Sequence, residues 1–225
     1  MSTDERRRAI LEAVRKVFAE NGFHGTTTRE LAETAGVLEA LLFKHFPTKE
    51  ALYSEMQQAT WEEISREDID RLMGLPPSTA SLVVLVHFLV WKILHCAMMR
   101  AESGPTYMEQ LMLRSMLEDG VFARGMLKRF EVSWLAKFQE CLAAAREEGT
   151  IVDSPVPDHL RGWLVHDMAV MTMVQMLPEP PVADHGLDRE ELVRHSTWFA
   201  LRGAGLKDDA IQRFYTPEAL ALLQR

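Results

Sequence analysis

The chain has 225 residues, of which 47% are hydrophobic and 26% charged, and its formal net charge is −8. This balance is typical of a soluble globular protein and excludes a fibrous or low-complexity chain. Its two cysteines, Cys96 and Cys141, form no CxxC or His/Cys cluster. We therefore expect neither a disulfide framework nor a structural zinc site. We expect a cytoplasmic location. The N-terminus, MSTDERRRAILEAV, lacks the apolar core of a secretory signal.

The acidic charge is unevenly distributed along the chain. Residues 1–50 hold eight Lys/Arg and eight Asp/Glu, so this segment is neutral, and the remaining residues carry the whole net charge of −8. A neutral segment with a few placed cations on an acidic remainder is compatible with DNA binding at one end.

Apolar residues recur at helical spacing almost everywhere, and no alternating run of strand length stands out. Gly22 and Gly36 are expected to end the first two helices, Thr28 to N-cap the second, and Pro47-Thr48 to separate the third from the fourth. The expected fold class is therefore all-α, with helices over residues 4–21, 28–35, 37–46, 49–73, 78–100, 106–117, 121–148, 158–177 and 188–202 and after Pro217.

One apolar stretch, residues 81–99, approaches the length of a membrane span. Lys92 lies inside it together with His87 and His95, and no second span or flanking basic cluster supports insertion. We expect a buried helix and no membrane association.

The segment around Gly36 has the pattern of a helix-turn-helix unit, because two short helices joined by a tight turn follow an amphipathic helix. On a wheel at about 100° per residue, Leu38, Leu42 and Phe46 share one face, which we expect to be buried. The exposed side then consists of Ala40, Leu41, Phe43 and Lys44, with Glu39 and His45 at its edges.

Residues 9–52, AILEAVRKVFAENGFHGTTTRELAETAGVLEALLFKHFPTKEAL, resemble the N-terminal domain of the TetR (tetracycline-repressor-like) family of transcriptional regulators. Residues 53–225 match that family only in helical character and length. The resemblance implies an N-terminal three-helix helix-turn-helix domain (residues 1–50) plus a helical-bundle ligand-binding and dimerisation domain (residues 51–225). It rests on the spacing of Phe18, Gly22-Phe23, Thr27-Thr28, Leu31-Ala32, Ala35-Gly36-Val37, His45-Phe46 and Lys49.

The resemblance also implies particular DNA contacts. Thr27 and Thr28 fall where the family holds phosphate with hydroxyls and a helix N-terminus, and Arg29 falls where some members read a guanine. The other expected contacts are phosphate contacts by Lys44, His45 and Lys49, packing by Phe43 at a position where Tyr is common, thymine methyl contacts by Ala40 and Leu41, and a cytosine contact by Glu39.

Each of these residues also has a purely structural interpretation. Thr28 serves only as a helix cap, Arg29 and Glu39 are solvated surface charges, and His45 packs against the fourth helix. Leu38 replaces the Ser that is common in the family, which weakens the N-cap of the third helix by about 1 kcal/mol.

In the remainder of the chain, one helix face is a candidate effector site. His87, Trp91 and His95 follow one another at four-residue spacing, and the two histidines are about 12 Å apart along the axis, too far to share one metal ion. We expect no metal and no other cofactor. A small apolar or aromatic effector is expected to contact these three residues together with Met98, Met112, Met116, Met168 and Met171, with ordinary core packing as the alternative.

The last two long helices carry residues suited to a four-helix interface between two chains, with burial inside one chain as the alternative. These residues are Leu160, Trp163, Leu164, Leu192, His195, Trp198 and Phe199.

Together these patterns favour a homodimeric repressor that binds a palindromic double-stranded DNA operator and is released by a small-molecule effector. One rival is a helical enzyme, but the sequence shows no nucleophile–base pair, metal cluster or phosphate loop, so we expect no enzymatic activity. The other rival is a helical ligand-binding or scaffold protein that has lost DNA binding, which Leu38, Glu39 and Phe43 would favour.

Overall fold

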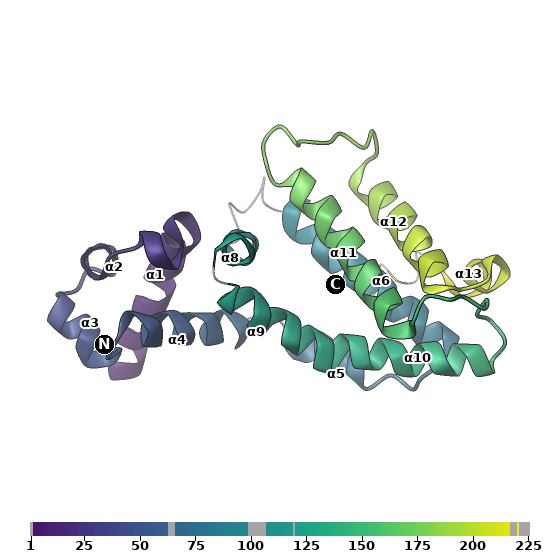
Figure 1. Ribbon diagram of the computed structural model, residues 1–225, viewed down its shortest axis with the longest axis horizontal. Helices are drawn as coiled ribbons and strands as arrows, with labels where there is room; N and C mark the ends of the chain where they lie inside the picture. Colours follow the sequence, from purple (N-terminus) through teal and green to yellow (C-terminus); the bar gives the residue numbers. More distant parts are fainter. Residues whose placement is uncertain (1, 63–65, 99–106, 119, 217–219, 221–225) are drawn as a thin grey trace. The chain divides into compact units, whose positions relative to one another are not determined.

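The computed structural model describes residues 2–62, 66–98, 107–118, 120–216 and 220, and these residues form helices and one isolated bridge between Ile151 and Leu206. The all-α expectation is therefore confirmed (Figure 1). The packing divides the chain into unit 1, Met1–Ile69 with Thr106–Arg129, and unit 2, Asp70–Pro105 with Phe130–Arg225. Unit 1 thus adds residues 51–69 and 106–129 to the segment expected to bind DNA, and the functional boundary at residue 50 stays a prediction.

Unit 1 is built from short helices around the long first one. Its core consists of large side chains that are almost fully buried, among them Phe18, Leu31 and Phe122, and the Phe18 and Tyr53 rings pack edge to face at 4.8 Å. The helices are α1 (Thr3–Gly25), α2 (Thr28–Thr34), α3 (Glu39–His45), α4 (Lys49–Glu62), α8 (Tyr107–Leu117) and α9 (Val121–Phe130).

Helix α1 extends beyond the expected end at Asn21, to Gly25, with a kink at Gly22. Gly22 has φ +73°, and a Cβ atom there would lie 2.3 Å from Oε1 of Glu118. The positive φ is what favours glycine at this position, because the end of the flexible Glu118 side chain can move away from a Cβ atom. The expected break in helical geometry is therefore present, although the helix resumes after it.

The turn between α2 and α3 follows the expected geometry, with one correction. Gly36 has φ +64°, and the Val37 N–H donates to the Ala32 carbonyl at 3.0 Å, which closes α2 after two turns. The N-cap of α2 is Thr27, whose hydroxyl accepts from the Glu30 N–H at 3.2 Å. The prediction that Thr28 caps this helix is therefore wrong by one residue.

Helix α3 confirms two of its three expected core residues. Leu42 and Phe46 are 2% and 1% exposed, whereas Leu38 is 79% exposed. The buried position predicted for Leu38 is wrong because the helix starts at Glu39: Leu38 is the N-cap, with extended backbone, and the helical wheel does not apply to it. Its side chain makes no capping hydrogen bond, as expected for leucine.

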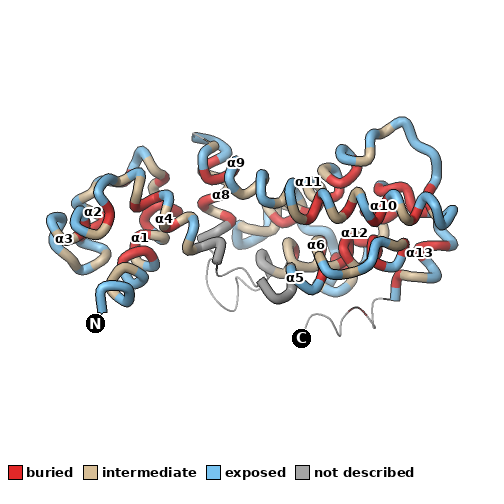
Figure 2. Tube along the Cα trace, turned by 90° about the horizontal axis from the view of Figure 1, so that it is seen from below, coloured by how far each residue is buried: buried red, intermediate tan, exposed pale blue. Residues whose placement is uncertain are grey.

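Unit 2 is a helical bundle around α6. Helix α6 packs against α10, α11, α12 and α13, and Leu82, Val86 and Val90 are completely buried or nearly so. Figure 2 shows red buried segments along these helices. The elements are α6 (Thr79–Met98), the π-helix η1 (Glu131–Leu135), α10 (Ala136–Glu147), α11 (Asp158–Met176), α12 (Arg189–Ala204) and α13 (Asp208–Phe214).

The buried helix expected over residues 81–99 is thus confirmed as far as the structure describes it, and none of the described helices is long and apolar enough to cross a membrane. Within residues 49–73 the structure describes α4 and α5 (Arg66–Met73), separated by the undescribed residues 63–65. Helix α13 was not predicted, and most of the helix expected after Pro217 lies outside the described residues.

Candidate nucleic-acid interface

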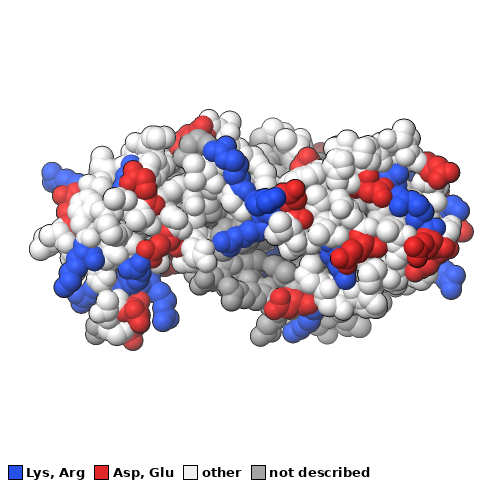
Figure 3. Space-filling view, turned by 60° about the horizontal axis from the view of Figure 1, so that its bottom comes forward, with Lys and Arg blue, Asp and Glu red and all other residues white. Residues whose placement is uncertain are grey.

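The outward face of α3 is small and mixed in character. Glu39, Ala40 and Lys44 are exposed, Phe43 is 41% exposed, and Leu41 is half-buried, while Leu42 points into the core. The wheel predicts this exposed set except for Leu41, which it places on the exposed side and which is half-buried. Figure 3 shows Lys and Arg side chains of unit 1 with carboxylates between them, so its surface is not uniformly basic.

The threonines at the start of α2 have distinct partners. The Thr27 hydroxyl accepts a backbone hydrogen bond as the N-cap, which leaves its O–H able to donate. The Thr28 hydroxyl instead donates to Oε1 of Glu39 at 2.9 Å. This bond links the first residue of α2 to the first residue of α3, and it orients the Glu39 carboxylate.

Arg29 is exposed and paired within its own helix. Its Nε donates to Oε1 of Glu33 at 2.8 Å, and the two side chains are 81% and 66% exposed. Hydrogen bonding to Glu33 raises the pKa of the Arg29 guanidinium, which therefore stays charged. Such an exposed pair contributes little to stability, so Arg29 can exchange Glu33 for another acceptor at low cost.

Lys49 is engaged inside unit 1. Its ammonium donates to the Thr26 carbonyl and lies 4.5 Å from the centroid of the Phe23 ring, and desolvation on burial lowers its pKa. The Thr26 hydroxyl donates to the Gly22 carbonyl at 2.6 Å. Together these bonds fix the loop between α1 and α2, and the ammonium points to the protein backbone.

Sequence reasoning missed a contact at the other end of α3. Arg7 of α1 donates to the carbonyl of His45 at 2.7 Å and pairs with Glu55 of α4, while the His45 ring is half-buried. Arg7 and Glu55 are 48 residues apart, so no local spacing signals this pair.

His87, one of the residues expected to bind an effector, lies in a buried polar cluster of unit 2. Its Nδ1 lies 3.4 Å from the hydroxyl of Thr197 and 3.5 Å from that of Tyr215. Desolvation on burial lowers the pKa of His87 to about 4, so the ring is neutral at neutral pH. The rings of Trp91 and His95 pack at 4.8 Å, and the Arg189 guanidinium contacts His95.

The methionines expected at the effector site are divided between the two units. Met168 is half-buried against the core of unit 2 and Met171 is 57% exposed, while Met112 packs against the core of unit 1 and Met116 is 47% exposed. The side chain of Met98 lies outside the described ones.

Helices α11 and α12 carry an exposed apolar surface, which we call the α11–α12 face. It consists of Leu160, Leu164, Met171 and Phe199, which are 42%, 54%, 57% and 68% exposed. The two helices pack against each other and against α6. Of the other residues expected at a dimer interface, Trp163 and Trp198 are half-buried, His195 is exposed, and Leu192 is 6% exposed in the core of unit 2.

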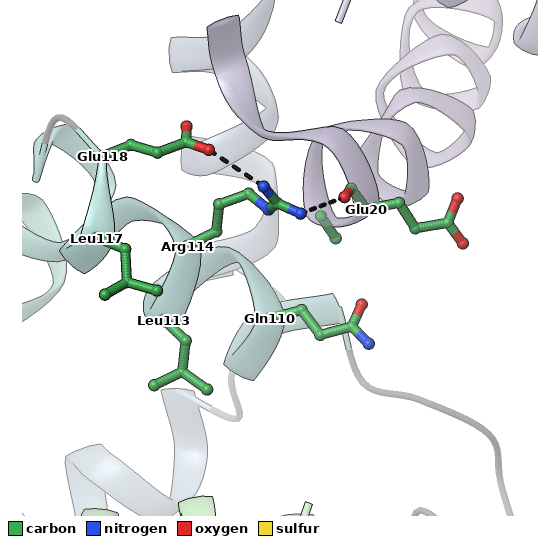
Figure 4. A pocket seen from close by; sticks show the side chains of 7 residues that line it. Glu20, Gln110, Leu113, Arg114, Leu117 and Glu118 are labelled. Carbon is green, nitrogen blue, oxygen red and sulfur yellow. Dashed lines mark hydrogen bonds and ion pairs between the residues drawn. The ribbon is translucent and has the colours of Figure 1, made fainter. Parts of the chain in front are cut away.

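A groove of about 500 Å³ lies between α1 and α8 in unit 1 (Figure 4). Arg114 of α8 reaches across it to donate to the Glu20 carbonyl at 2.5 Å, and on its own side it donates to Glu118 at 3.2 Å. A second groove, of about 620 Å³, lies between α1 and α4. None of the residues expected to bind an effector lines either groove. Among the described residues, no three His, Cys, Asp or Glu side chains are grouped so as to hold a metal ion.

Comparison with known proteins agrees with the geometry of unit 1. A family model described as "Bacterial regulatory proteins, tetR family" matches residues 10–56, which include α2, the turn at Gly36 and α3. Residues 10–56 therefore carry an N-terminal domain of the TetR-family type.

Relatives with curated descriptions match short parts of the chain. The chain is 40% identical to the HTH-type transcriptional repressor AcnR of Corynebacterium diphtheriae over 67 residues, which are 30% of this chain and 31% of AcnR. It is 48% identical to the HTH-type transcriptional regulator RutR of Escherichia coli over 48 residues, 21% of this chain and 23% of RutR. The match thus spans less than a third of either relative, and both relatives are named as regulators.

Solved structures share their fold with most of the chain. NalD, described as the secondary repressor of the MexAB-OprM multidrug efflux pump in Pseudomonas aeruginosa, matches with a TM-score of 0.65 at 21% identity and covers 92% of this chain and 98% of its own. Salmonella enterica GusR matches with a TM-score of 0.58 at 19% identity, over 91% and 97% of the two chains. At this identity the likeness establishes the fold alone.

Proposed function

We propose that this TetR-family chain is a cytoplasmic transcriptional repressor whose α3 enters the major groove of duplex DNA. The observation that carries the proposal is the outward face of α3, with Ala40, Phe43 and Lys44 exposed opposite the buried Leu42. A helix held by one buried face and presenting the other is what major-groove recognition requires. The relatives named as regulators support this function.

The contacts divide into those that read bases and those that grip phosphate. Glu39 accepts from the amino group of a cytosine, with its carboxylate oriented by Thr28 at 2.9 Å, and Ala40 and Leu41 contact thymine methyls. Arg29 reads a guanine after it leaves Glu33. Thr27, Lys44 and His45, which flank the base-contacting residues, bind phosphate, and Phe43 packs on sugar.

Lys49 contributes to this interface indirectly. Its ammonium already binds the Thr26 carbonyl, so we assign it the role of fixing the loop that positions Thr27 and Thr28.

The α11–α12 face is the proposed dimer interface. Large apolar side chains gathered on one exposed surface are costly in a monomer, and two helices from each of two chains make a four-helix interface. A two-fold dimer places two copies of α3 in successive major grooves of a palindromic operator, about 34 Å apart. Leu192 supports this surface from inside unit 2.

The effector proposal rests on the interior of unit 2. His87, Thr197 and Tyr215 form a polar cluster within apolar surroundings, which suits a small apolar or aromatic molecule with one polar group. An effector that binds more tightly to a conformation with low affinity for DNA lowers DNA binding. The extent is set by the difference between its affinities for the two conformations.

Fluorescence anisotropy with a labelled duplex from the region upstream of this chain's own gene tests the function. The parent is expected to bind it more tightly than a scrambled duplex, and Phe43→Ala with Lys44→Ala is expected to weaken specific binding by about tenfold or more. Lys16→Ala, which removes an exposed cation of α1, is the matched control. No binding by the parent at low salt would favour a ligand-binding or scaffold protein, and turnover of a bound ligand would favour an enzyme.

A further inference from the structure

The C-terminal end of α3 is held by a cluster that we call the Arg7 clamp: Arg7 of α1, Glu55 of α4, the His45 carbonyl and the Phe46 ring. We propose that Arg7 and Glu55 are positioning residues that set the orientation of α3 on DNA, although neither side chain touches DNA. This inference rests on the proposed function and adds two residues to its machinery.

The clamp joins three helices through one guanidinium. Nη1 of Arg7 donates to the His45 carbonyl at 2.7 Å, and Nε donates to Oε2 of Glu55 at 3.0 Å. Nη2 also donates to the Glu55 carboxylate, and the guanidinium carbon lies 4.5 Å from the centroid of the Phe46 ring. Arg7 therefore links the end of α3 to both α1 and α4.

Helix α3 needs such support because it is short. It has seven residues, and its N-cap, Leu38, offers no side-chain hydrogen bond. Isolated helices of this length are marginal in water, and the last carbonyls of any helix lack partners within it. The Arg7 bond satisfies one of these carbonyls at the end opposite to the weak cap.

The planar guanidinium suits this role in a way that an ammonium does not. It presents N–H groups in a fixed fork, so one edge binds the carboxylate while another N–H reaches the carbonyl. The side chains of Arg7 and Glu55 are 36% and 38% exposed, so their net contribution to global stability is small. The contribution of the clamp lies in the direction it gives to α3.

Charge and geometry make opposite predictions for Glu55→Gln. Removal of a carboxylate close to α3 lowers repulsion with phosphate, so electrostatics alone predicts tighter DNA binding. Loss of the carboxylate also frees Arg7 from the fork, so the clamp predicts weaker specific binding. The sign of the change therefore distinguishes the two effects.

The test uses the full-length chain, the duplex that the parent selects from a random-sequence library, and a scrambled duplex of equal length. Glu55→Gln and Arg7→Lys are expected to weaken binding to the selected duplex about tenfold. Binding to the scrambled duplex should stay within about twofold, because phosphate contacts are retained. The matched control is Glu20→Gln, which removes the same charge from an exposed site on α1.

Equal or tighter binding of the selected duplex by Glu55→Gln would overturn the inference. An equal loss on both duplexes would also overturn it, because that result indicates general destabilisation rather than misplacement of α3.

Hydrogen exchange of the backbone amides of residues 41–46 provides a readout without DNA. The clamp predicts faster exchange in Glu55→Gln and Arg7→Lys than in the parent, and parental exchange in Glu20→Gln. Unchanged exchange in all three variants contradicts the clamp whether or not the chain binds DNA. Failure of the parent to select any duplex contradicts the proposed function, and the exchange result then decides the clamp alone.

Discussion

The outward face of α3 and the α11–α12 face both present side chains to solvent, but they differ in how much free energy this exposure costs. On α3 the exposed residues are Ala40, Lys44, Glu39 and a Phe43 that is 41% exposed. On α11 and α12, four large apolar side chains are 42–68% exposed. The first surface is stable in water before it meets a polyanion, whereas the second gains free energy only when another apolar surface covers it.

This difference indicates two kinds of interaction. A small mixed surface suits a transient, salt-dependent contact with DNA, and a larger apolar one suits a lasting contact between copies of the chain. Each of the following changes should affect one surface and leave the other unchanged.

The largest effect is expected for Leu164→Asp, which places a carboxylate on the α11–α12 face. The dimer should dissociate, and affinity for the selected duplex should fall by about two orders of magnitude or more, because the two DNA-binding domains then bind independently. Analytical ultracentrifugation gives the mass, and anisotropy gives the affinity. Val182→Asp, at an exposed site between α11 and α12, is the control and should stay dimeric. A Leu164→Asp variant that stays dimeric would contradict the assignment of this face.

Acidification should weaken unit 2 from within. The pKa of His87 in the folded chain is about 4, below its ordinary value of 6.5, so folding favours the neutral ring. Its contribution to stability is complete above pH 6.5 and is lost as the pH falls towards 4, by up to about 3 kcal/mol. Because Thr197 of α12 contacts His87, this loss should also loosen the α11–α12 face.

Urea unfolding followed by tryptophan fluorescence at pH 7, 6 and 5 measures this effect. His87→Asn keeps a polar group for Thr197 and Tyr215 but cannot titrate, so its stability should fall less steeply with pH than that of the parent. His185→Asn, at an exposed site, should follow the parent. Identical pH profiles for the parent and His87→Asn would show that another group causes the acid sensitivity.

Base preference is the next test of the α3 face. Glu39→Gln exchanges an acceptor-only carboxylate for an amide that bonds adenine in bidentate fashion. The preferred base at one position of each half-site should change from cytosine to adenine, with discrimination of about 1 kcal/mol. Selection from a random-sequence library before and after the substitution shows the change. An unaltered preference would return Glu39 to the role of a surface charge.

Local spacing predicted much of the molecule correctly. The all-α fold, the buried α6 and the core positions of Leu42 and Phe46 follow from helical periodicity, which depends on residues three and four apart. The outward set on α3 follows from the same geometry.

The errors occur where a helix begins. Thr28 was assigned as though α2 started one residue later than it does, and Leu38 as though α3 started two residues earlier. The face of a residue is defined only inside the helix. Sequence signals fix such boundaries least well, because several residues near a start can serve as the cap.

The contacts that sequence reasoning missed are long-range. Arg7 with Glu55, and Lys49 with Thr26, join residues 48 and 23 positions apart. No periodic pattern encodes such pairs. Arg7 and Lys49 are charged side chains that spacing alone assigns to solvent or to DNA. Only packing shows that Lys49 binds the protein's own backbone.

The smallest effect is expected for Lys44→Ala. Lys44 is exposed on α3 and is assigned to one phosphate, so its loss should weaken all duplexes by about fivefold near physiological salt and reduce the slope of log affinity against log salt by about one. The ratio of selected to scrambled affinity should stay constant, in contrast to Glu39→Gln. Binding titrations of both duplexes at four salt concentrations measure the salt slope and the affinity ratio separately, with Lys16→Ala as the control. A changed ratio with an unchanged slope would mean that Lys44 reads a base, and the division of the α3 face into reading and gripping residues would then be wrong.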